Sequence, residues 1–276
     1  MIRTVTIGDI HGRDRWKDIL FGSTYHYENW RREVDENIHS LFVDEYPVLK
    51  EADRIIFVGD YTDSFHVSNV VILQNLKEIV HLKRTYPDKV VLLLGNHDIN
   101  YILPNSYCSG YRPEARFDLE SVFRENADLF KLAHLEENNE GEQILWTHAG
   151  VTKPWLEILR NICFSPDFRF HKIFKGSEGL RVDELINKAW EYRVDPLTYA
   201  DSDSGGSHRW AGPLWVRPRR LIQYALDGID QIVGHTPQKS LEKRNNVAGT
   251  ANIYIVDVLE KYDNSSENPQ TLFINL

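Results

Sequence analysis

Five short apolar runs, rich in β-branched residues, recur along the chain, and a small group of polar residues follows each of them. Runs of this length that end at polar groups predict buried strands of an α/β fold. The five runs are Val5–Ile7, Ile55–Val58, Val90–Leu94, Ile144–Trp146 and Ile232–Val233. A longer segment, Ser68–Thr85, carries apolar residues at helical spacing, begins with a Ser/Asn cap signal and stops before a proline, which predicts a helix packed on a sheet.

The polar residues after the five runs carry metal-ligand chemistry. They form the segments Gly8-Asp9-Ile10-His11-Gly12, Gly59-Asp60-Tyr61-Thr62-Asp63, Gly95-Asn96-His97-Asp98, Thr147-His148-Ala149-Gly150 and Gly234-His235-Thr236. Every candidate ligand therefore lies just beyond the carboxyl end of a predicted strand, where α/β sheets leave a crevice for ligands and where loops carry catalytic groups.

The candidate ligands are aspartate, asparagine and histidine side chains, with no thiolate among them. Oxygen and imidazole donors suit divalent ions such as Mn, Fe or Zn, and they do not indicate a structural thiolate zinc site. A bridging carboxylate would hold two ions about 3.5–4 Å apart, a spacing at which a metal pair activates water and binds phosphoryl oxygens. We expect Asp60 to be this bridge, so the pattern predicts a two-metal phosphoesterase site.

In this order the motifs resemble those of the calcineurin-like metallophosphoesterases, and more narrowly the PPP phosphatase branch with its GDxHG, GDxVDRG, GNH(D/E), HAG-type and final-His motifs. The resemblance spans positions 8 to 236. It implies an α/β fold that is a four-layer αββα sandwich of two mixed sheets flanked by helices. It also implies two divalent metal ions, manganese first with iron or zinc as alternatives, and direct attack of a dimetal-bound hydroxide on phosphorus.

Carried over residue by residue, the resemblance assigns eight side chains to the site. The expected metal ligands are Asp9 and His11 for the first ion, Asp60 as the bridge, and Asn96, His148 and His235 for the second ion. His97 would be the acid that protonates the leaving oxygen, and Asp63 the carboxylate that orients it. This pairing is chemically sound, because a carboxylate on one imidazole nitrogen fixes the tautomer and charge of a histidine that donates a proton.

One departure from the family pattern concerns the binding of the substrate phosphate. Ser64-Phe65 stands where the second motif usually continues with Arg-Gly, so a phosphate-binding arginine is missing from its usual place. The segment Gly212–Arg217 resembles the GPLWxR segment of bacterial-type PPP enzymes, including the Shewanella-like phosphatases, and Arg217 is therefore expected to bind phosphate through a bidentate fork. Arg112, in the loop after the third motif, is a second candidate, with an ordinary paired surface charge as the alternative.

The final motif, Gly234-His235-Thr236-Pro237, lacks the second histidine of the GHxH form, which favours the PPP-like branch over the metallophosphoesterases that carry it. Within that branch the chain resembles the bacterial or Shewanella-like phosphatases or the diadenosine tetraphosphatase-like members. The substrate stays open. A phosphate monoesterase of the Ser/Thr or broad-specificity protein phosphatase type is the leading hypothesis, and a dinucleoside polyphosphate hydrolase is the alternative. A non-catalytic binding scaffold is a remote third possibility, which the complete ligand set disfavours. The expected partner is a phosphorylated protein or a nucleotide.

We predict a single domain over residues 1–276 with two insertions. The insertion at about 14–53 is aromatic and is expected to add helix near the metal cleft; Tyr27 and Trp30 are candidates to stack a base, with core or rim packing as the alternative. The insertion at about 153–213 is expected to form a helical cap, with helices near Trp155–Cys163 and Val182–Tyr192.

Two strand-like segments near the carboxyl end, Ile253–Val258 and Thr271–Ile274, are expected to complete a second sheet. The net charge of −9 argues against tight nonspecific binding to nucleic acid. No apolar stretch approaches the roughly 18–20 residues of a membrane span, and the amino terminus leaves no room for a signal peptide, so we expect a cytoplasmic protein without a membrane partner. The two cysteines lack C-x-x-C spacing, which fits a reducing compartment.

Overall fold

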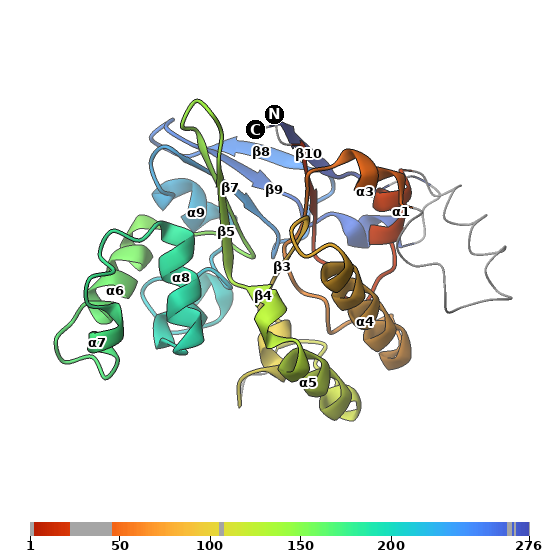
Figure 1. The fold of residues 1–276 in the computed structure, drawn as a ribbon, viewed down its shortest axis with the longest axis horizontal. Helices are drawn as coiled ribbons and strands as arrows, with labels where there is room; N and C mark the ends of the chain where they lie inside the picture. The colour runs from red at the N-terminus through yellow and green to blue at the C-terminus, as the bar shows by residue number, and fades with distance from the viewer. Residues whose placement is uncertain (1–2, 23–45, 105–107, 264–266, 268, 276) are drawn as a thin grey trace, which may run out of the picture. The chain divides into compact units, whose positions relative to one another are not determined.

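The computed structural model describes residues 3–22, 46–104, 108–263, 267 and 269–275. The chain divides into two compact units, each with a five-stranded mixed sheet and helices (Figure 1). Unit 1 comprises Met1–Phe130, Pro237–Leu241 and Val256–Leu276, and unit 2 comprises Lys131–Thr236 and Glu242–Ile255. The predicted α/β fold with two mixed sheets flanked by helices is confirmed, whereas the prediction of a single domain stays a prediction.

The sheet of unit 1 has the strand order β10-β1-β2-β3-β4. Its strands are β1 (Arg3–Ile7), β2 (Arg54–Phe57), β3 (Val90–Leu93), β4 (Phe130–Lys131) and β10 (Leu272–Asn275). The three central strands β1, β2 and β3 run parallel, so the loops that follow them meet at one edge of the sheet. These are the strands that the apolar runs before the first three motifs predict.

The last strand corrects one prediction. β10 does not complete the second sheet but pairs antiparallel with β1, with Phe273 opposite Val5. Without this pairing, the outer edge of β1 would present a row of open backbone hydrogen-bonding groups. The apolar run of β10 specifies a strand but carries no information on which sheet it joins.

The helices of unit 1 include α4, which matches the predicted amphipathic helix. The α-helices are α1 (Trp16–Phe21), α3 (Pro47–Glu51), α4 (Asn69–Thr85) and α5 (Arg116–Glu125), and the 3-10 turns are η1 (Asp98–Tyr101), η2 (Pro113–Ala115), η3 (Ala127–Leu129) and η6 (Leu259–Tyr262). Ser68 caps α4 and accepts a hydrogen bond from the backbone N–H of Val71. α4 contacts both β3 and α5 (Figure 1).

The first insertion contributes helix and core at its two described ends, where α1 and α3 lie. Trp16 packs its ring 5.9 Å from that of Phe57 and 6.2 Å from that of Tyr46, and its indole N–H donates to the side chain of Asn75. Trp16 and Tyr46 are therefore core residues of unit 1. Tyr27 and Trp30, the candidates for base stacking, lie outside the described residues.

The sheet of unit 2 has the strand order β5-β6-β7-β9-β8. Its strands are β5 (Ala133–Glu137), β6 (Gln143–Thr147), β7 (Ile229–Val233), β8 (Glu242–Asn245) and β9 (Asn252–Ile255). β6, β7 and β9 run parallel, and β5 and β8 are antiparallel edge strands. The loops that carry the fourth and fifth motifs thus follow two adjacent parallel strands.

Residues 153–213 contain the helices predicted near Trp155–Cys163 and Val182–Tyr192, whereas their being an inserted cap stays a prediction. The helices of unit 2 are α6 (Lys153–Cys163), α7 (His171–Phe174), α8 (Val182–Glu191) and α9 (Pro218–Tyr224), with 3-10 turns η4 (Asp195–Thr198) and η5 (Ser202–Ser204). α8 packs on β5, where the amide of Asn187 accepts from the backbone of Leu132 and donates to the carbonyl of Ala133. Among the helices that the structure describes, none has the length and apolar character needed to cross a bilayer.

Candidate active site

Four of the predicted site residues have a left-handed backbone. They are His11 (φ 46°), Asp60 (φ 53°), Asp63 (φ 57°) and His235 (φ 65°), and within the described ranges Arg193 is the one other non-glycine residue of this kind. This conformation costs a residue with a Cβ about 1–2 kcal/mol, and such strain gathers at functional sites. The backbone itself therefore marks the loops after β1, β2 and β7 as unusual.

The loops after β1 and β2 are joined by their backbones. The carbonyl of Asp60 accepts hydrogen bonds from the N–H groups of Ile10 (3.1 Å) and His11 (2.6 Å), and the N–H of Gly12 donates to the carbonyl of Tyr61 (3.0 Å). The turn at Asp60 is thus fixed against the turn at His11, so the relative position of these two side chains is set by main-chain contacts.

A fully buried carboxylate, that of Asp98, ties the loop after β2 to the loop after β3. It accepts from the backbone N–H groups of Asp60 (2.8 Å), Tyr61 (2.9 Å), Thr62 (3.3 Å) and Gly95 (2.8 Å), and from the hydroxyl of Thr62 (3.1 Å). The sequence analysis gave Asp98 no role. Its position in the Gly95–Asp98 motif was a signal, since a carboxylate placed among turn N–H groups often organises them.

Two glycines allow the loops after β2 and β3 to touch. A Cβ on Gly59 would lie 2.8 Å from Cα of Gly95, and a Cβ on Gly95 would overlap the carboxylate and N–H of Asp60. A side chain at position 95 would consequently displace Asp60, the predicted bridging ligand.

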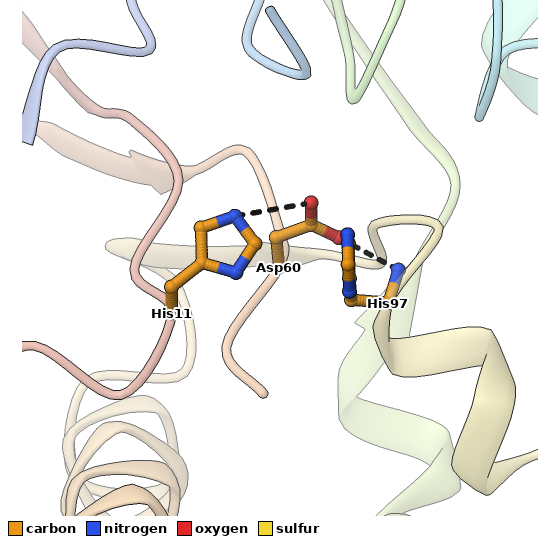
Figure 2. A group of neighbouring side chains, drawn as sticks. All are labelled: His11, Asp60 and His97. Atoms are coloured by element: carbon orange, nitrogen blue, oxygen red, sulfur yellow. Dashed lines mark hydrogen bonds and ion pairs between the residues drawn. The ribbon is translucent and has the colours of Figure 1, made fainter. Parts of the chain in front are cut away.

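The side chains of His11, Asp60 and His97 form a cluster in unit 1 (Figure 2). Nε2 of His11 lies 3.6 Å from Oδ2 of Asp60, and the backbone N–H of His97 donates to Oδ1 of Asp60 over 2.9 Å. One ligand atom from each residue lies within 4.8 Å of the others. A carboxylate oxygen of Asp9 also lies within 4.8 Å of one of Asp60, so Asp60 has two further predicted ligands of this unit beside it, His11 and Asp9.

His11 is set up as a neutral ligand. Its Nδ1 lies 3.1 Å from the carbonyl oxygen of Thr62 and 3.0 Å from that of Asp63, which requires a proton on Nδ1 and leaves Nε2 with its lone pair toward Asp60. Burial lowers the pKa of His11 below its ordinary value, and the neighbouring His97 and Arg13 add to this, although Asp60 opposes it. A neutral imidazole is the form that binds metal.

His97 has the opposite electrostatics. Nδ1 of His97 lies 3.0 Å from Oδ2 of Asp63, and Asp63 also accepts from the amide of Asn100 (2.9 Å) and from the hydroxyl of Tyr101. Burial lowers the pKa of His97, but the carboxylates of Asp60 and Asp63 outweigh it and raise the pKa to about 9. In this environment, without metal ions, His97 is protonated at neutral pH. Asn100 and Tyr101 hold the carboxylate of Asp63 in place, and no sequence motif indicates this role.

Asn96, the predicted ligand after β3, is buried beside a cysteine. Its side-chain Nδ2 donates to Sγ of Cys108, and the thiol donates to the backbone carbonyl of Asn96, each over 3.5 Å. Burial raises the pKa of the Cys108 thiol to about 11, so this group is a neutral thiol rather than a metal ligand at neutral pH. Cys108 is partly exposed.

Unit 2 brings its two predicted histidine ligands together. His148 follows β6 and His235 follows β7, their rings are 5.1 Å apart in an edge-to-face arrangement, and the N–H of Gly234 donates to the carbonyl of His148. Arg217 donates from Nη1 to the carbonyl of His235 (3.1 Å) and to the hydroxyl of Thr236 (3.2 Å). The predicted phosphate-binding arginine thus lies against the loop of the last histidine.

Arg112 lies against the loop after the second motif. Its guanidinium donates to the carbonyl oxygens of Ser64 and Val67. The loop that lacks the family's arginine at position 64 is therefore held by an arginine from a later segment, and the structure shows Arg112 in contact with protein backbone.

A pocket of about 160 Å³ opens beside His11 and His97 in unit 1. It is lined by His11, Arg13, Asp63, Ser64, Phe65, His66, His97, Ser109, Gly110 and Glu260. The buried Arg13 on its wall is engaged by carboxylates, with Nε 2.6 Å from Asp263 and Nη2 3.7 Å from Glu260. The pocket is the space in unit 1 that a group near the imidazole of His97 could occupy.

The motifs, in order and after the strands described above, match a family model named calcineurin-like phosphoesterase over residues 2–239. The chain belongs to the calcineurin-like phosphoesterase family. No curated protein sequence is significantly similar to it. As a member of this family the protein is a metal-dependent phosphoesterase, and the family uses two divalent metal ions.

Solved structures with similar folds include a cold-active protein-tyrosine phosphatase from Shewanella sp., at 15% identity and a TM-score of 0.50, covering 100% of this chain and 76% of that one. The phosphatase domain of the Legionella effector WipB is 14% identical, with a TM-score of 0.47, over 86% of this chain and 100% of that one. A dimetal phosphatase from Danio rerio is 10% identical, with a TM-score of 0.35, over 94% and 88% of the two chains. At 15% identity, the similarity to the Shewanella structure is a similarity of fold alone.

The residues of this phosphoesterase fit a pair of divalent ions. Carboxylate and imidazole donors converge without thiolate, His11 presents a neutral nitrogen beside Asp60, and strained turns hold both side chains in place. The donor chemistry suits Mn, Fe or Zn, and it does not select among them.

Proposed function

We propose that the protein hydrolyses phosphate monoesters, in the manner of a Ser/Thr-type or broad-specificity protein phosphatase. The observation that carries this proposal is the pair formed by Nδ1 of His97 and Oδ2 of Asp63, 3.0 Å apart beside Asp60. A carboxylate accepts and does not donate, so the pair holds a proton on Nδ1 and leaves Nε2 as the donor toward substrate.

A positioned acid matters most when the leaving group is basic. Loss of an alkoxide from a serine or threonine ester is slow without protonation, and general acid catalysis contributes about 10²–10⁴-fold to such steps. A nucleotide that leaves from a polyphosphate is a much weaker base and needs less help. The built His97–Asp63 pair therefore favours a monoesterase over the alternative, a dinucleoside polyphosphate hydrolase.

We propose six side chains as the ligands of the two ions, with manganese as the first choice. They are Asp9, His11, Asp60 and Asn96 of unit 1 and His148 and His235 of unit 2. When bound, two such ions lower the pKa of a coordinated water and neutralise the phosphoryl oxygens. His11 would supply its neutral Nε2 and Asp60 its carboxylate, and Asp98 holds the turn that carries Asp60.

We propose Arg217 as the phosphate-binding arginine in place of the one missing from the second motif. A guanidinium binds a phosphoryl group through two parallel hydrogen bonds, and Nη1 of Arg217 is already fixed by the His235 loop. Arg112 donates to two backbone carbonyls, which supports a role in holding the loop of Ser64; its predicted contact with phosphate stays a prediction. The cytoplasmic location and the cap role of the second insertion also stay predictions.

The experiment is a side-by-side hydrolysis assay of the Mn-loaded protein on a phosphoserine peptide and on diadenosine tetraphosphate, with the Asp60→Asn variant as the blank. Preferential turnover of the peptide supports the proposal. Preferential cleavage of the dinucleotide would replace it with the polyphosphate hydrolase, and absence of hydrolysis despite bound metal would favour the non-catalytic scaffold.

A further inference from the structure

Phe65 stands in the loop after the second motif and is 74% exposed. A single exposed phenylalanine is ordinary on a protein surface. This one borders the same pocket as His97 and Asp63, the residues of the proposed acid pair. It also stands where the family's second motif usually has glycine.

The loop that carries Phe65 is held from two sides. Oγ of Ser64 accepts from the backbone N–H groups of His66 and Val67, each at 3.2 Å. From outside the loop, the guanidinium of Arg112 donates to the carbonyls of Ser64 and Val67. The backbone of Phe65 is therefore fixed before substrate arrives, which reduces the entropy lost when its ring makes a contact.

The pocket that Phe65 and His97 line is large enough for an aromatic ring. Its volume is about 160 Å³, and a protein cavity of about 150 Å³ is known to take up benzene. The pocket thus has room for one six-membered ring. Gly110 lines it too, and a Cβ there would lie 3.8 Å from Cε2 of Phe65 and 3.6 Å from Cβ of Asp63, at the edge of that space.

We propose that Phe65 is a specificity-determining residue that selects phosphate monoesters with an aromatic ring on the leaving oxygen, the class to which phosphotyrosine belongs. The inference rests on the proposed function, because the ring belongs to the leaving group that His97 protonates. A ring bonded directly to that oxygen extends from His97 into the pocket and meets the phenyl group of Phe65 in an offset or edge-to-face contact. A serine side chain is too small to reach it.

The test measures kcat/KM on two peptides that differ in one residue, phosphotyrosine or phosphoserine. Phe65→Ala is expected to lower kcat/KM about tenfold on the phosphotyrosine peptide and less than about twofold on the phosphoserine peptide. Phe65→Tyr keeps the ring and is expected to retain activity on both. Each variant is compared with the wild type on the same substrate, so the different reactivities of phenoxide and alkoxide cancel.

Phe117→Ala is the matched control, because Phe117 is 82% exposed and is not among the residues that line the pocket. It is expected to change neither rate. Thermal denaturation of Phe65→Ala is expected to match the wild type, since an exposed ring contributes little to stability. A rate loss accompanied by a large drop in Tm would overturn the assignment of Phe65 to specificity.

Equal losses on the two peptides, or no loss on either, would overturn the inference and leave the proposed function standing. AMP, tested as a third substrate, separates the two sources of an aromatic ring: a loss on AMP as large as on phosphotyrosine would overturn the assignment of the contacted ring to the leaving oxygen. If the wild type hydrolyses neither peptide but cleaves diadenosine tetraphosphate, the proposed function fails and the inference fails with it.

Discussion

Oδ2 of Asp63 lies 3.0 Å from Nδ1 of His97, and Asp63 is itself held by the amide of Asn100 and the hydroxyl of Tyr101. The imidazole is therefore oriented by a carboxylate that cannot easily move. Because the N–H at Nδ1 donates a hydrogen bond to Asp63, Nε2 is the atom that can protonate a leaving oxygen. This arrangement makes the role of His97 depend on the basicity of the leaving group.

Replacing His97 with asparagine is expected to lower kcat on a phosphoserine peptide by about 10²–10⁴-fold. The loss on 4-nitrophenyl phosphate should be much smaller, because nitrophenolate leaves without protonation. Steady-state rates on both substrates measure the difference, with His81→Asn, an exposed histidine of α4, as the control. Equal losses on the two substrates would contradict the acid role.

The raised pKa of His97 predicts a pH-dependent stability for the metal-free protein. Burial lowers this pKa, but Asp60 and Asp63 raise it from 6.5 to about 9. The folded state therefore binds the proton more tightly, so the stabilisation is complete below pH 6.5 and is lost as the pH rises through about 9. The free energy of unfolding should fall in this window by up to about 3 kcal/mol more in the wild type than in His97→Asn.

Urea denaturation of the two metal-free proteins at pH 6, 7.5 and 9.5 provides the measurement. Titrations of groups whose pKa does not depend on His97 affect both proteins alike and cancel in the difference. A difference between wild type and His97→Asn that does not change with pH would show that the folded protein leaves the pKa of His97 at its ordinary value.

Asp98→Asn is expected to destabilise the protein by about 2 kcal/mol or more, because the asparagine NH₂ would face backbone donors that now share one buried carboxylate. It should also weaken metal binding, since Asp98 holds the turn at Asp60. Urea denaturation and elemental analysis test the two effects, with the exposed Asp88→Asn as control. Unchanged stability and metal content would show that Asp98 neither stabilises the fold nor positions Asp60 for metal binding.

Gly95→Ala is expected to reduce metal content and turnover at least tenfold, because its Cβ would overlap the carboxylate of Asp60. Gly179→Ala is the matched control, since a Cβ there meets no atom within 4 Å and neither glycine has a left-handed backbone. Elemental analysis and phosphopeptide hydrolysis on both variants provide the comparison. A fully active Gly95→Ala enzyme would show that this close approach does not position Asp60.

The sequence predicts most of what positions the site. Each apolar run that ends at a glycine and a ligand forms a strand of the expected sheet, because burial on both faces imposes continuous hydrophobicity and the turn that follows imposes glycine. The cap at Ser68 and the stop before Pro87 set the limits of α4 for equally local reasons. Strands, turns and helix ends depend mainly on residues that are close together in the sequence, so the sequence predicts them well.

Long-range partners could not be predicted in the same way. The apolar run of β10 does not reveal that it pairs with β1, more than 260 residues away. The sequence around Arg112 leaves two roles open for this residue, a phosphate ligand and a paired surface charge. It does not show that the guanidinium donates to the carbonyls of Ser64 and Val67. Asp98 likewise gains its role from donors that three-dimensional folding gathers around it.

The measurement that tests the central claim most directly is metal content and phosphopeptide hydrolysis on the same samples of wild type, Asp60→Asn and the control Asp88→Asn, after loading with manganese. Asp60 contacts both His11 and the backbone of His97 and is the proposed bridge between the ions. The account predicts about two manganese ions per chain and peptide turnover in the wild type and the control, with both strongly reduced in Asp60→Asn. Full metal content and full turnover in Asp60→Asn would contradict it.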